Sequence, residues 1–436
     1  MTEIFLTIFF ISVLLFFLGS GVWVAISMIG VSTIGMILFT SRPVGDAMAT
    51  TIWGTSSSWT LTALPLFVWM GEILFRTRLS ENLFAGLSPW MQKLPGGLIH
   101  VNVVGCALFA AISGSSAATV ATVGKMSIPE LRKRKYPERI LLGSLAGSGT
   151  LGLLIPPSII LIIYGVTVQE SIAKLFIAGI LPGIMIALIF MSYVVIWSLI
   201  NKKSMPKYVE SFSFLEKIKK SKQLLPVIIL ISAVIGSIYT GVATATEAAS
   251  LGVVGALILS YFQGSLTVES FKLSLLGATK TSCMIAFILA GSTFLSLAMG
   301  FTGLPRNLAL WIQNMELSPY VLIFVLMIFY IILGMFLDGI SAVVLTMAII
   351  EPMIRQAGFD MIWFGIFLVI VVEMAQITPP VGFNLFVLQG MANKDMGFIA
   401  RSAFPLFVLM ILAVILVVIF PEIALWMPQQ MVQNIN

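Results

Sequence analysis

Four apolar stretches of this sequence are interrupted by residues that could bind small ions. Two carry a Pro-Pro pair, Pro156-Pro157 in "GLLIPPSIILIIYG" and Pro379-Pro380 in "QITPPVGFNLFVLQG". The other two carry small and polar residues, in "SGSSAATVATVG" (113–124) and "GMFLDGISAVVLT" (334–346). Hydroxyl and carbonyl oxygens suit a hard monovalent cation, whereas the free N–H groups at helix starts suit an anion such as a carboxylate.

The two Pro-Pro pairs predict breaks inside helices. Proline in a helix interior removes an N–H donor and clashes with the preceding turn, but it is favoured at the first position of a helix. Each pair therefore marks where one half-helix ends and another begins, with Thr378 placed to cap the second half and Ser158 in the matching first turn of the other. A single such pair could be a simple kink, but two about half a chain apart favour breaks.

The two polar stretches predict the tips of helical hairpins. The first tip gathers hydroxyls around Gly114, and the second gathers Asp338, Gly339 and Ser341. Small residues let backbones approach closely, and Ser hydroxyls can cap the helix that follows. Packing alone would also use such residues, and a turn exposed to water would also tolerate an aspartate. A carboxylate inside an apolar run is nevertheless a functional candidate, and Asp338 could order the hairpin, bind a polar group of a ligand or join a cation site. For Glu373, upstream of the second break, a structural hydrogen bond is at least as plausible as a functional role.

Composition fixes the class of protein. The chain has 436 residues, of which 59% are hydrophobic and 10% charged, and its mean hydropathy is +1.08. A soluble domain is typically about a quarter charged, so these values predict a polytopic membrane protein. The apolar runs are continuous, which favours helices over a barrel. One His and two Cys leave little material for metal-centred or His-based catalysis, so a membrane-embedded enzyme is disfavoured.

The apolar runs predict about ten spans, and residues 98–127 and 320–354 are too interrupted to be single spans. We predict that both are re-entrant hairpins. With that assignment, 20 of the Lys and Arg residues fall on one side and 4 on the other, as the positive-inside rule requires. Both termini are then outside. The net charge of +6 reflects this asymmetry and indicates no nucleic-acid partner.

The predicted elements occur twice in the same order: an interfacial helix, a hairpin, a Pro-Pro span and a following span. Because the two hairpins enter from opposite sides, the fold class is an all-α membrane protein with an inverted-topology repeat, as in many secondary transporters. The expected division is scaffold helices (1–78), a first repeat (79–200, broken helix about 139–164), a basic loop with scaffold helices (201–300), and a second repeat (301–436, broken helix about 361–390).

The chain resembles a known family, the DctM-type large membrane subunit of TRAP transporters. The combination of matching segments is specific and spans most of the chain: "LTALPLFVWMGEIL" (61–74), "SGSSAATVATVGKMSIPEL" (113–131), "IPPSIILIIYG" (155–165), "TATEAAS" (244–250), "FLDGISAVVLT" (336–346) and "ITPPVGFNLFVLQG" (377–390). One departure is Ala245, where relatives often carry Pro; it concerns a scaffold turn.

This resemblance implies a sodium-coupled importer of carboxylate-bearing solutes in the bacterial inner membrane, with the hairpins and broken helices moving elevator-fashion against a scaffold. It implies two partners, a small four-helix membrane subunit and a periplasmic solute-binding protein. Carried over by position, the sodium candidates are Ser113, Ser115, Gly149, Thr150, Gly339, Ser341, Thr378 and Gly382. The substrate candidates are Ser116, Ser158, Asp338 and Asn384.

Two other transport classes share parts of this pattern. A self-sufficient Na⁺/dicarboxylate symporter would have the same hairpins and inverted repeat, and would differ by needing neither a binding protein nor a small subunit. A passive channel is disfavoured, because paired hairpins closing on a midplane site favour alternating access. The sequence leans slightly toward sialic acid or a related sugar acid as the solute, with C4-dicarboxylates and other organic acids as alternatives.

Overall fold

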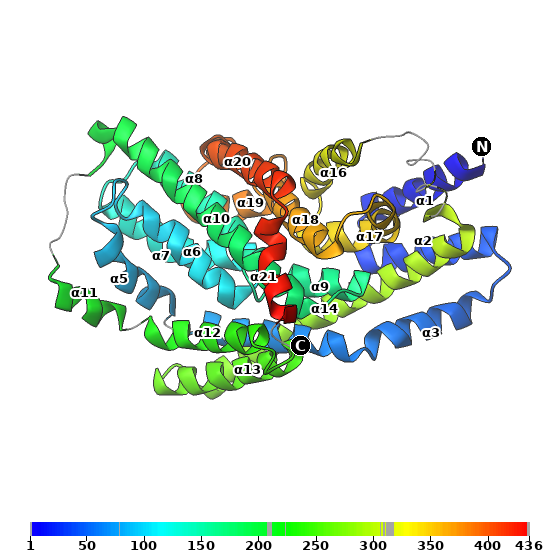
Figure 1. The fold of residues 1–436 in the computed structure, drawn as a ribbon, viewed down its shortest axis with the longest axis horizontal. Coiled ribbons are helices and arrows are strands. Elements are labelled where there is room, and N and C mark those ends of the chain that lie inside the picture. Colours follow the sequence, from blue (N-terminus) through cyan, green and yellow to red (C-terminus); the bar gives the residue numbers. More distant parts are fainter. Residues whose placement is uncertain are drawn as a thin grey trace.

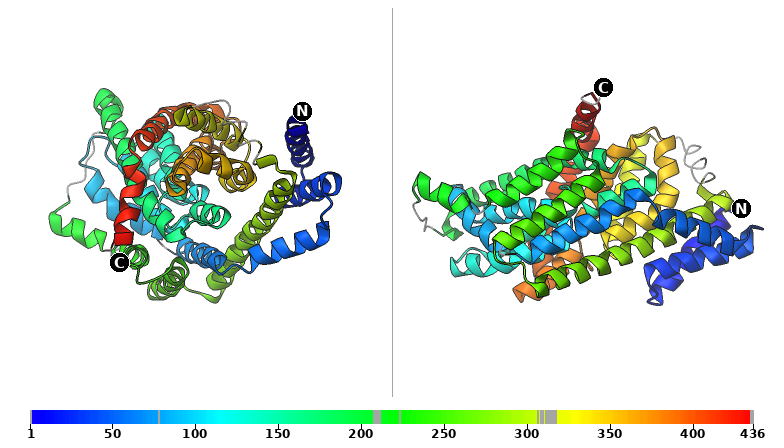
Figure 2. Two further views of the ribbon diagram at one scale, coloured as in Figure 1. Left: turned by 45° about the vertical axis from the view of Figure 1, so that its right-hand side comes forward. Right: turned by 90° about the horizontal axis from the view of Figure 1, so that it is seen from below.

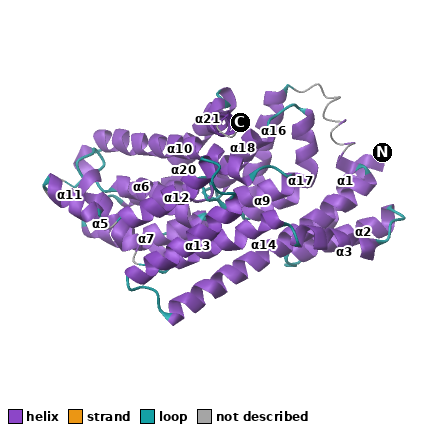
Figure 3. Cartoon of the chain, turned by 60° about the horizontal axis from the view of Figure 1, so that its bottom comes forward, coloured by secondary structure: helices purple, strands orange, loops and turns teal. Residues whose placement is uncertain are grey.

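The computed structural model describes residues 2–77, 79–206, 212–222, 224–305, 307, 310 and 318–433. Over this part of the chain the regular structure is entirely helical, and no strand is present (Figures 1 and 3). This confirms the all-α fold class. The long apolar runs form helices because a helix satisfies every backbone polar group within its own segment, which lipid cannot do.

The N-terminal helices form part of the scaffold. They are α1 (Thr2–Gly19), α2 (Val24–Phe39), α3 (Val44–Ser56), the 3-10 helix η1 (Trp59–Thr62) and α4 (Ala63–Phe75). The apolar run at 52–75, one of the predicted spans, is not a single straight helix. The chain bends by 53° between α3 and α4. The break falls at the serine run 56–58, and serine favours caps and turns because its hydroxyl competes for nearby backbone groups.

The first hairpin and the first broken helix form as predicted. The elements of this region are α5 (Leu79–Met91), α6 (Ile99–Ser113), α7 (Ser116–Lys133), α8 (Glu138–Gly149), η2 (Thr150–Leu153), α9 (Ile159–Val168) and α10 (Ile172–Ile200). Helices α6 and α7 are the two arms of the hairpin, and α8 and α9 are the two halves of the broken helix.

The remaining helices add scaffold and repeat the pattern. The middle of the chain forms η3 (Lys202–Ser204), α11 (Phe214–Ser221), α12 (Leu225–Tyr239), α13 (Ala245–Phe262) and α14 (Val268–Thr302). The second hairpin and broken helix follow as α16 (Pro319–Gly334), α17 (Gly339–Gln356), α18 (Met361–Ala375) and α19 (Phe383–Ala392), and the chain closes with α20 (Met396–Ile419) and α21 (Glu422–Gln433). The interfacial helix predicted at 303–316 lies largely outside the described residues.

The helices pack as two groups, the scaffold and the hairpins with the broken helices. Helix α14 packs on α2, α3 and α4, and α13 packs on α4 and α12, which builds the scaffold. In the other group α8 packs on α20, and α19 packs on α7. Helices of the first and second repeats, far apart in sequence, are therefore in contact. Figure 2 (left) shows the scaffold helices curving around one side of the hairpins and broken helices.

Span lengths agree with a multi-pass membrane protein. Within the described residues five helices are long and apolar enough to cross a membrane, or up to seven if each of two bent pairs is one span. The other apolar segments are shorter helices, among them α9, α18 and α19 at the Pro-Pro breaks. A helix of 10 residues covers about 15 Å, so each broken helix needs both halves to span the hydrocarbon core.

Contacts between distant loops agree with the predicted sides. Arg355 pairs with Glu170 at 3.6 Å, and its guanidinium donates to the Val168 carbonyl at 2.9 Å. Arg132 donates to the Ala392 carbonyl at 2.7 Å. The charge pattern places the segments around residues 168–170 and 355 on the outer side of the membrane. It places the segments around residues 132 and 392 on the cytoplasmic side. The contacts therefore match the re-entrant assignment.

The close packing of η2 on the first hairpin yields a stability prediction. A Cβ at Gly152 would lie 2.6 Å from the Ser115 carbonyl oxygen, whereas a Cβ at Gly236 in α12 would meet no described atom within 4 Å. We expect Gly152→Ala to destabilise the protein by about 1–3 kcal/mol, because backbone must shift to admit the methyl group. Thermal unfolding in detergent measures this.

Gly236→Ala is the matched control, since alanine favours a helix interior over glycine by about 1 kcal/mol. An unchanged unfolding midpoint for Gly152→Ala would contradict the described packing.

Candidate functional site

The tip of the first hairpin is built by a glycine and a serine. Gly114 ends α6 with a φ of 56°, a left-handed conformation that glycine adopts without steric cost. Ser115 then caps α7, where its hydroxyl accepts the Ala118 N–H at 3.4 Å. Thr119 closes the turn, since its hydroxyl lies 2.8 Å from that of Ser113. The capping serine predicted at this tip is confirmed.

The first tip touches the first Pro-Pro break. A Cβ on Gly114 would lie 2.9 Å from the Pro157 carbonyl oxygen, so only a residue without a side chain fits here. Ser158 caps α9, with its hydroxyl accepting the Leu161 N–H at 3.3 Å and donating to the Leu153 carbonyl. The tip and the break therefore face each other, and Ser158 lies one position earlier than the predicted first turn.

The second tip repeats this arrangement with a carboxylate. Asp338 caps α17, and its Oδ2 accepts the N–H groups of Ile340 and Ser341 at 3.1 and 3.2 Å. The tip packs on α18 just before the second break, because a Cβ on Gly334 would lie 2.6 Å from the Ala375 Cβ. The role of Asp338 in ordering its hairpin is thus visible, and its carboxylate offsets the partial positive charge of the helix start.

Thr378 does not cap the second half-helix, and that prediction is wrong. Helix α19 begins after Gly382, whose φ is 48° and which has no side chain to cap with. The Thr378 hydroxyl instead donates to the Met374 carbonyl at 2.8 Å. The turn after the Pro-Pro pair delays the start of α19 until Phe383, and the Asn384 N–H donates to the Gln376 carbonyl at 3.1 Å.

The two tips open onto one cavity of about 1240 Å³. Residues 113–118 of the first tip and 338–341 of the second line it, together with Gln376 and Phe383 on either side of the second break. Scaffold residues from the start of α2 and from α4 and α14 complete the lining. Two helix starts, those of α7 and α17, therefore border one space, and such starts attract anions.

The first set of sodium candidates gathers around η2. Gly152 packs on Ser115, and Gly149 packs on Val120 of α7. The Thr150 hydroxyl donates to the Gly147 carbonyl at 2.6 Å and faces the Met410 sulfur. Fully buried Asn384 lies beside Gly149, and its Oδ1 and Nδ2 have no hydrogen-bond partner among the described residues. An orphaned amide oxygen at this point fits a cation ligand.

The second set of sodium candidates lies at the second tip and break. Gly339 and Ser341 belong to the tip, and Ser341 is almost fully buried. A Cβ on Gly382 would lie 2.8 Å from the Thr378 carbonyl oxygen, so these two residues face each other closely. Carbonyl and hydroxyl oxygens are concentrated here without a second carboxylate, which is the chemistry of a monovalent cation site.

The four substrate candidates divide into two pairs. Ser116 and Asp338 line the cavity from opposite tips. Ser158 and Asn384 are fully buried, and neither is among the residues that line the cavity. Their positions support the helix break and the surroundings of Gly149 rather than direct contact with a solute. The role of all four in binding stays a prediction.

Two further polar residues connect the tips with the second break. Glu373 is fully buried, and its Oε1 accepts the Ser116 hydroxyl at 3.1 Å, which ties the first tip to the second repeat's broken helix. The structural hydrogen bond weighed for Glu373 is thus present. Gln376 lines the cavity with a side-chain Nε2 that has no partner among the described residues. Its position directly before "ITPP" is the signal that could have singled it out.

Comparison with a solved structure shows the fold class. The chain is similar to the YdaH transporter of Alcanivorax borkumensis, with a TM-score of 0.63 and coverage of 87% of each chain. Sequence identity to it is 10%, so this likeness concerns the fold alone. The two chains share a helical fold.

Sequence comparison shows the family. The profile described as "Tripartite ATP-independent periplasmic transporter, DctM component" matches residues 10–423. The C4-dicarboxylate TRAP transporter large permease protein DctM of Pseudomonas aeruginosa is 32% identical, over 92% of this chain and 93% of that one. The sialic acid TRAP transporter large permease protein SiaM of Vibrio cholerae is 30% identical, over 94% and 96%. This chain belongs to the DctM family, and it is a large permease subunit of a tripartite transporter rather than an enzyme.

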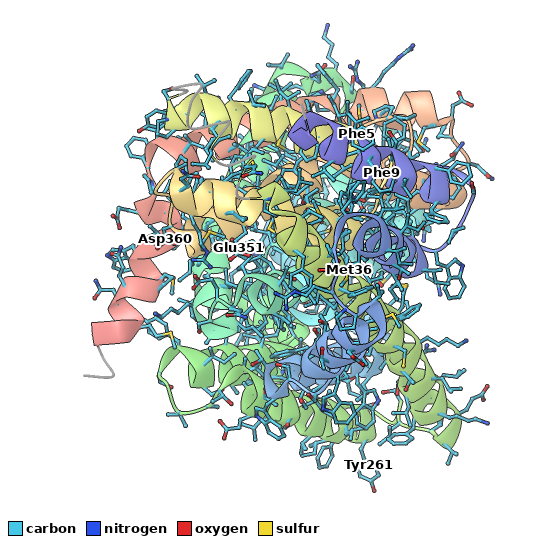
Figure 4. The ribbon with its side chains drawn as sticks, turned by 90° about the vertical axis from the view of Figure 1, so that its right-hand side faces the viewer. Phe5, Phe9, Met36, Tyr261, Glu351 and Asp360 are labelled. Carbon is cyan, nitrogen blue, oxygen red and sulfur yellow. The ribbon has the colours of Figure 1, made fainter. Side chains whose placement is uncertain are left out.

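Two matched caps separate the structural role of Asp338 from a role in transport. Asp360 caps α18 as Asp338 caps α17, accepting two backbone N–H groups at 2.8 and 2.9 Å. Asp360 is exposed and is not among the cavity-lining residues, and Figure 4 shows it beside Glu351 near the edge of the view. We expect either substitution by Ala to cost about 1 kcal/mol of stability.

Only Asp338→Ala should abolish solute uptake, measured in proteoliposomes with folded protein. Equal uptake by both variants would remove Asp338 from the site.

Proposed function

We propose that this protein imports a carboxylate-bearing solute with sodium ions, working with a small four-helix membrane subunit and a periplasmic solute-binding protein. It would lie in the bacterial inner membrane with both termini in the periplasm. The observation that carries the proposal is the meeting of two hairpin tips and two helix breaks around one cavity. This arrangement supplies anion-binding helix starts and cation-binding oxygens while needing few membrane-embedded charges.

The anion site follows from the helix starts. The N-terminal turns of α7 and α17 border the cavity, and each presents partial positive charge with backbone N–H groups. Asp338 uses two N–H groups of α17, so the start of α7 at Ser116 is the freer of the two. A solute carboxylate would bind there through backbone N–H groups, because the Ser116 hydroxyl already donates its proton to Glu373.

The cation sites follow from the backbone breaks. Sodium would bind among Ser113, Ser115, Gly149 and Thr150 on one side, and among Gly339, Ser341, Thr378 and Gly382 on the other. Each set joins a tip to a break, so a bound ion would fix the tip in place and complete the solute site. This linkage explains how a sodium gradient could drive uptake: the solute binds best when the ions are present.

Movement of the solute would follow an elevator mechanism. The cavity lies between the hairpin group and the scaffold helices, so sliding of one group along the other would expose the solute to opposite sides. On the topology predicted from charge, the scaffold residues at this cavity lie near the cytoplasmic ends of α2, α4 and α14. The described arrangement would then be the inward-facing one.

The solute class is drawn from relatives whose names include C4-dicarboxylate and sialic acid. Both are organic acids, and both fit a site whose first requirement is a carboxylate. The alternative function is a self-sufficient Na⁺/dicarboxylate symporter. The family is described as tripartite, which favours the form that depends on a binding protein and a small subunit.

Reconstitution distinguishes these functions. The chain with its small subunit would be placed in proteoliposomes and supplied with labelled succinate or sialic acid, with and without a sodium gradient and binding protein. We expect uptake of one solute only when both the gradient and the binding protein are present. Sodium-driven uptake without the binding protein would indicate the self-sufficient symporter, and uptake that ignores sodium would contradict ion coupling.

A further inference from the structure

The scaffold wall of the cavity carries charges that the proposed function does not use. Helices α4 and α14 contribute Glu72 and Lys280 to this wall, which borders the same cavity as the tips. Among the described residues that line the cavity, Lys280 is the basic one, and Glu72 and Asp338 are the acidic ones. A carboxylate-bearing solute in this space would meet all three, so their available charge decides how it binds.

Both acidic groups are already engaged. Glu72 pairs with Arg76 one turn along α4 at 3.0 Å. It also packs closely on α14, because a Cβ on Gly277 would lie 2.7 Å from its Oε2. Asp338 accepts two N–H groups at the start of α17. Each carboxylate is thus matched by a local positive charge, which weakens its repulsion of an incoming anion.

Lys280 differs from these residues, because the described part of the chain shows no ion pair for it within 4 Å. Its side chain is exposed, and it lies on α14 one turn beyond Gly277. A lysine ammonium is a compact charge on a flexible stem with three donors, so it can follow a ligand within reach. The scaffold side of the cavity therefore presents a positive charge for which the described residues offer no acidic partner.

We propose that Lys280 binds a carboxylate of the solute from the scaffold side while the tips hold the rest of the molecule. This inference rests on the proposed function, since it assigns the residue that recognises the solute's charge. It adds a scaffold contact to a site that the family motifs place only on the hairpins and breaks. Such a contact would help to select acidic solutes over neutral ones of the same size.

The chain carries its own reporter for this contact. Cys283 is an exposed free thiol that lines the same cavity, three residues after Lys280. The other cysteine, Cys106, is fully buried. A maleimide should therefore label the folded protein at Cys283, and a solute bound in the cavity should slow that labelling. This readout reports binding without requiring transport.

The experiment compares three variants in nanodiscs containing the small subunit. The concentration of succinate or sialic acid that halves the labelling rate would be measured for wild type, Lys280→Gln, Lys280→Arg and Lys272→Gln. A separate Cys283→Ser protein would give the labelling that does not come from Cys283. Lys272 is the matched control, an exposed lysine on the same helix that is not among the cavity-lining residues. The Lys272→Gln variant tests whether loss of another α14 lysine also weakens the protection of Cys283. Such a general effect could arise if these lysines only set the orientation in the membrane.

We expect Lys280→Gln to raise the half-protecting concentration roughly five- to thirtyfold, because a charged hydrogen bond to the solute is lost. Lys280→Arg should stay near wild type because it keeps the charge, and Lys272→Gln should match wild type. Each variant's own unprotected rate serves as its reference, so a changed thiol reactivity does not enter the comparison.

Three results would overturn the inference. Equal protection of wild type and Lys280→Gln would remove Lys280 from the site, as would an equal loss in Lys272→Gln. Wild type that imports a solute in proteoliposomes yet shows no protection of Cys283 would place the solute elsewhere and leave the proposed function standing. Wild type that imports neither acid would reject the proposed solute class, and with it the inference.

Discussion

The structure depends on one constraint: backbone polar groups freed at helix breaks in an apolar setting must be satisfied inside the protein. The chain breaks two helices, at Pro156-Pro157 and at Pro379-Pro380, and brings a hairpin tip to each. Close approach is possible because glycines stand where the backbones meet; Gly114 against the Pro157 carbonyl and Gly152 against Ser115 leave no room for a methyl group. The tips in turn are fixed by Ser115 and Asp338 capping the helices that follow.

Function follows from the same constraint. Breaks and tips concentrate carbonyl oxygens, hydroxyls and helix starts in one region, and these groups can serve ions without permanent membrane charges. The hydrogen bond from Ser116 to Glu373 joins the two halves of the site across 257 residues of sequence. The first tip and the break of the second repeat are therefore in direct contact.

The features that depend on local sequence could be predicted. Glycine, proline and serine at fixed places in apolar runs identified both hairpins and both breaks, because each residue type restricts the backbone in its own way. The failures concern packing. Thr378 was expected to cap α19, but the turn through Gly382 lets the chain travel further before the helix starts. The bend after α3 was missed because apolar content continues across the serine run.

The scaffold wall could not be predicted from the sequence, because nothing in a single helix shows which cavity its residues line. In the sequence, Lys280 is one of many basic residues near a membrane surface. Only the packing of α14 beside α4 and the tips distinguishes it. Ser158 and Asn384 show the converse. Their place in matching motifs suggested solute contact, but both are fully buried and neither lines the cavity, so that role stays a prediction.

The central claim is that tips and breaks together form sodium sites, and equilibrium stability tests it most directly. A ligand that binds only the folded state raises its stability by RT ln(1 + [L]/Kd). The thermal unfolding midpoint of the purified subunit would be measured in increasing NaCl and in matched KCl. The account predicts a saturable rise with sodium that potassium does not reproduce and that Ser115→Ala weakens. The same rise in both salts, or none in either, would contradict it.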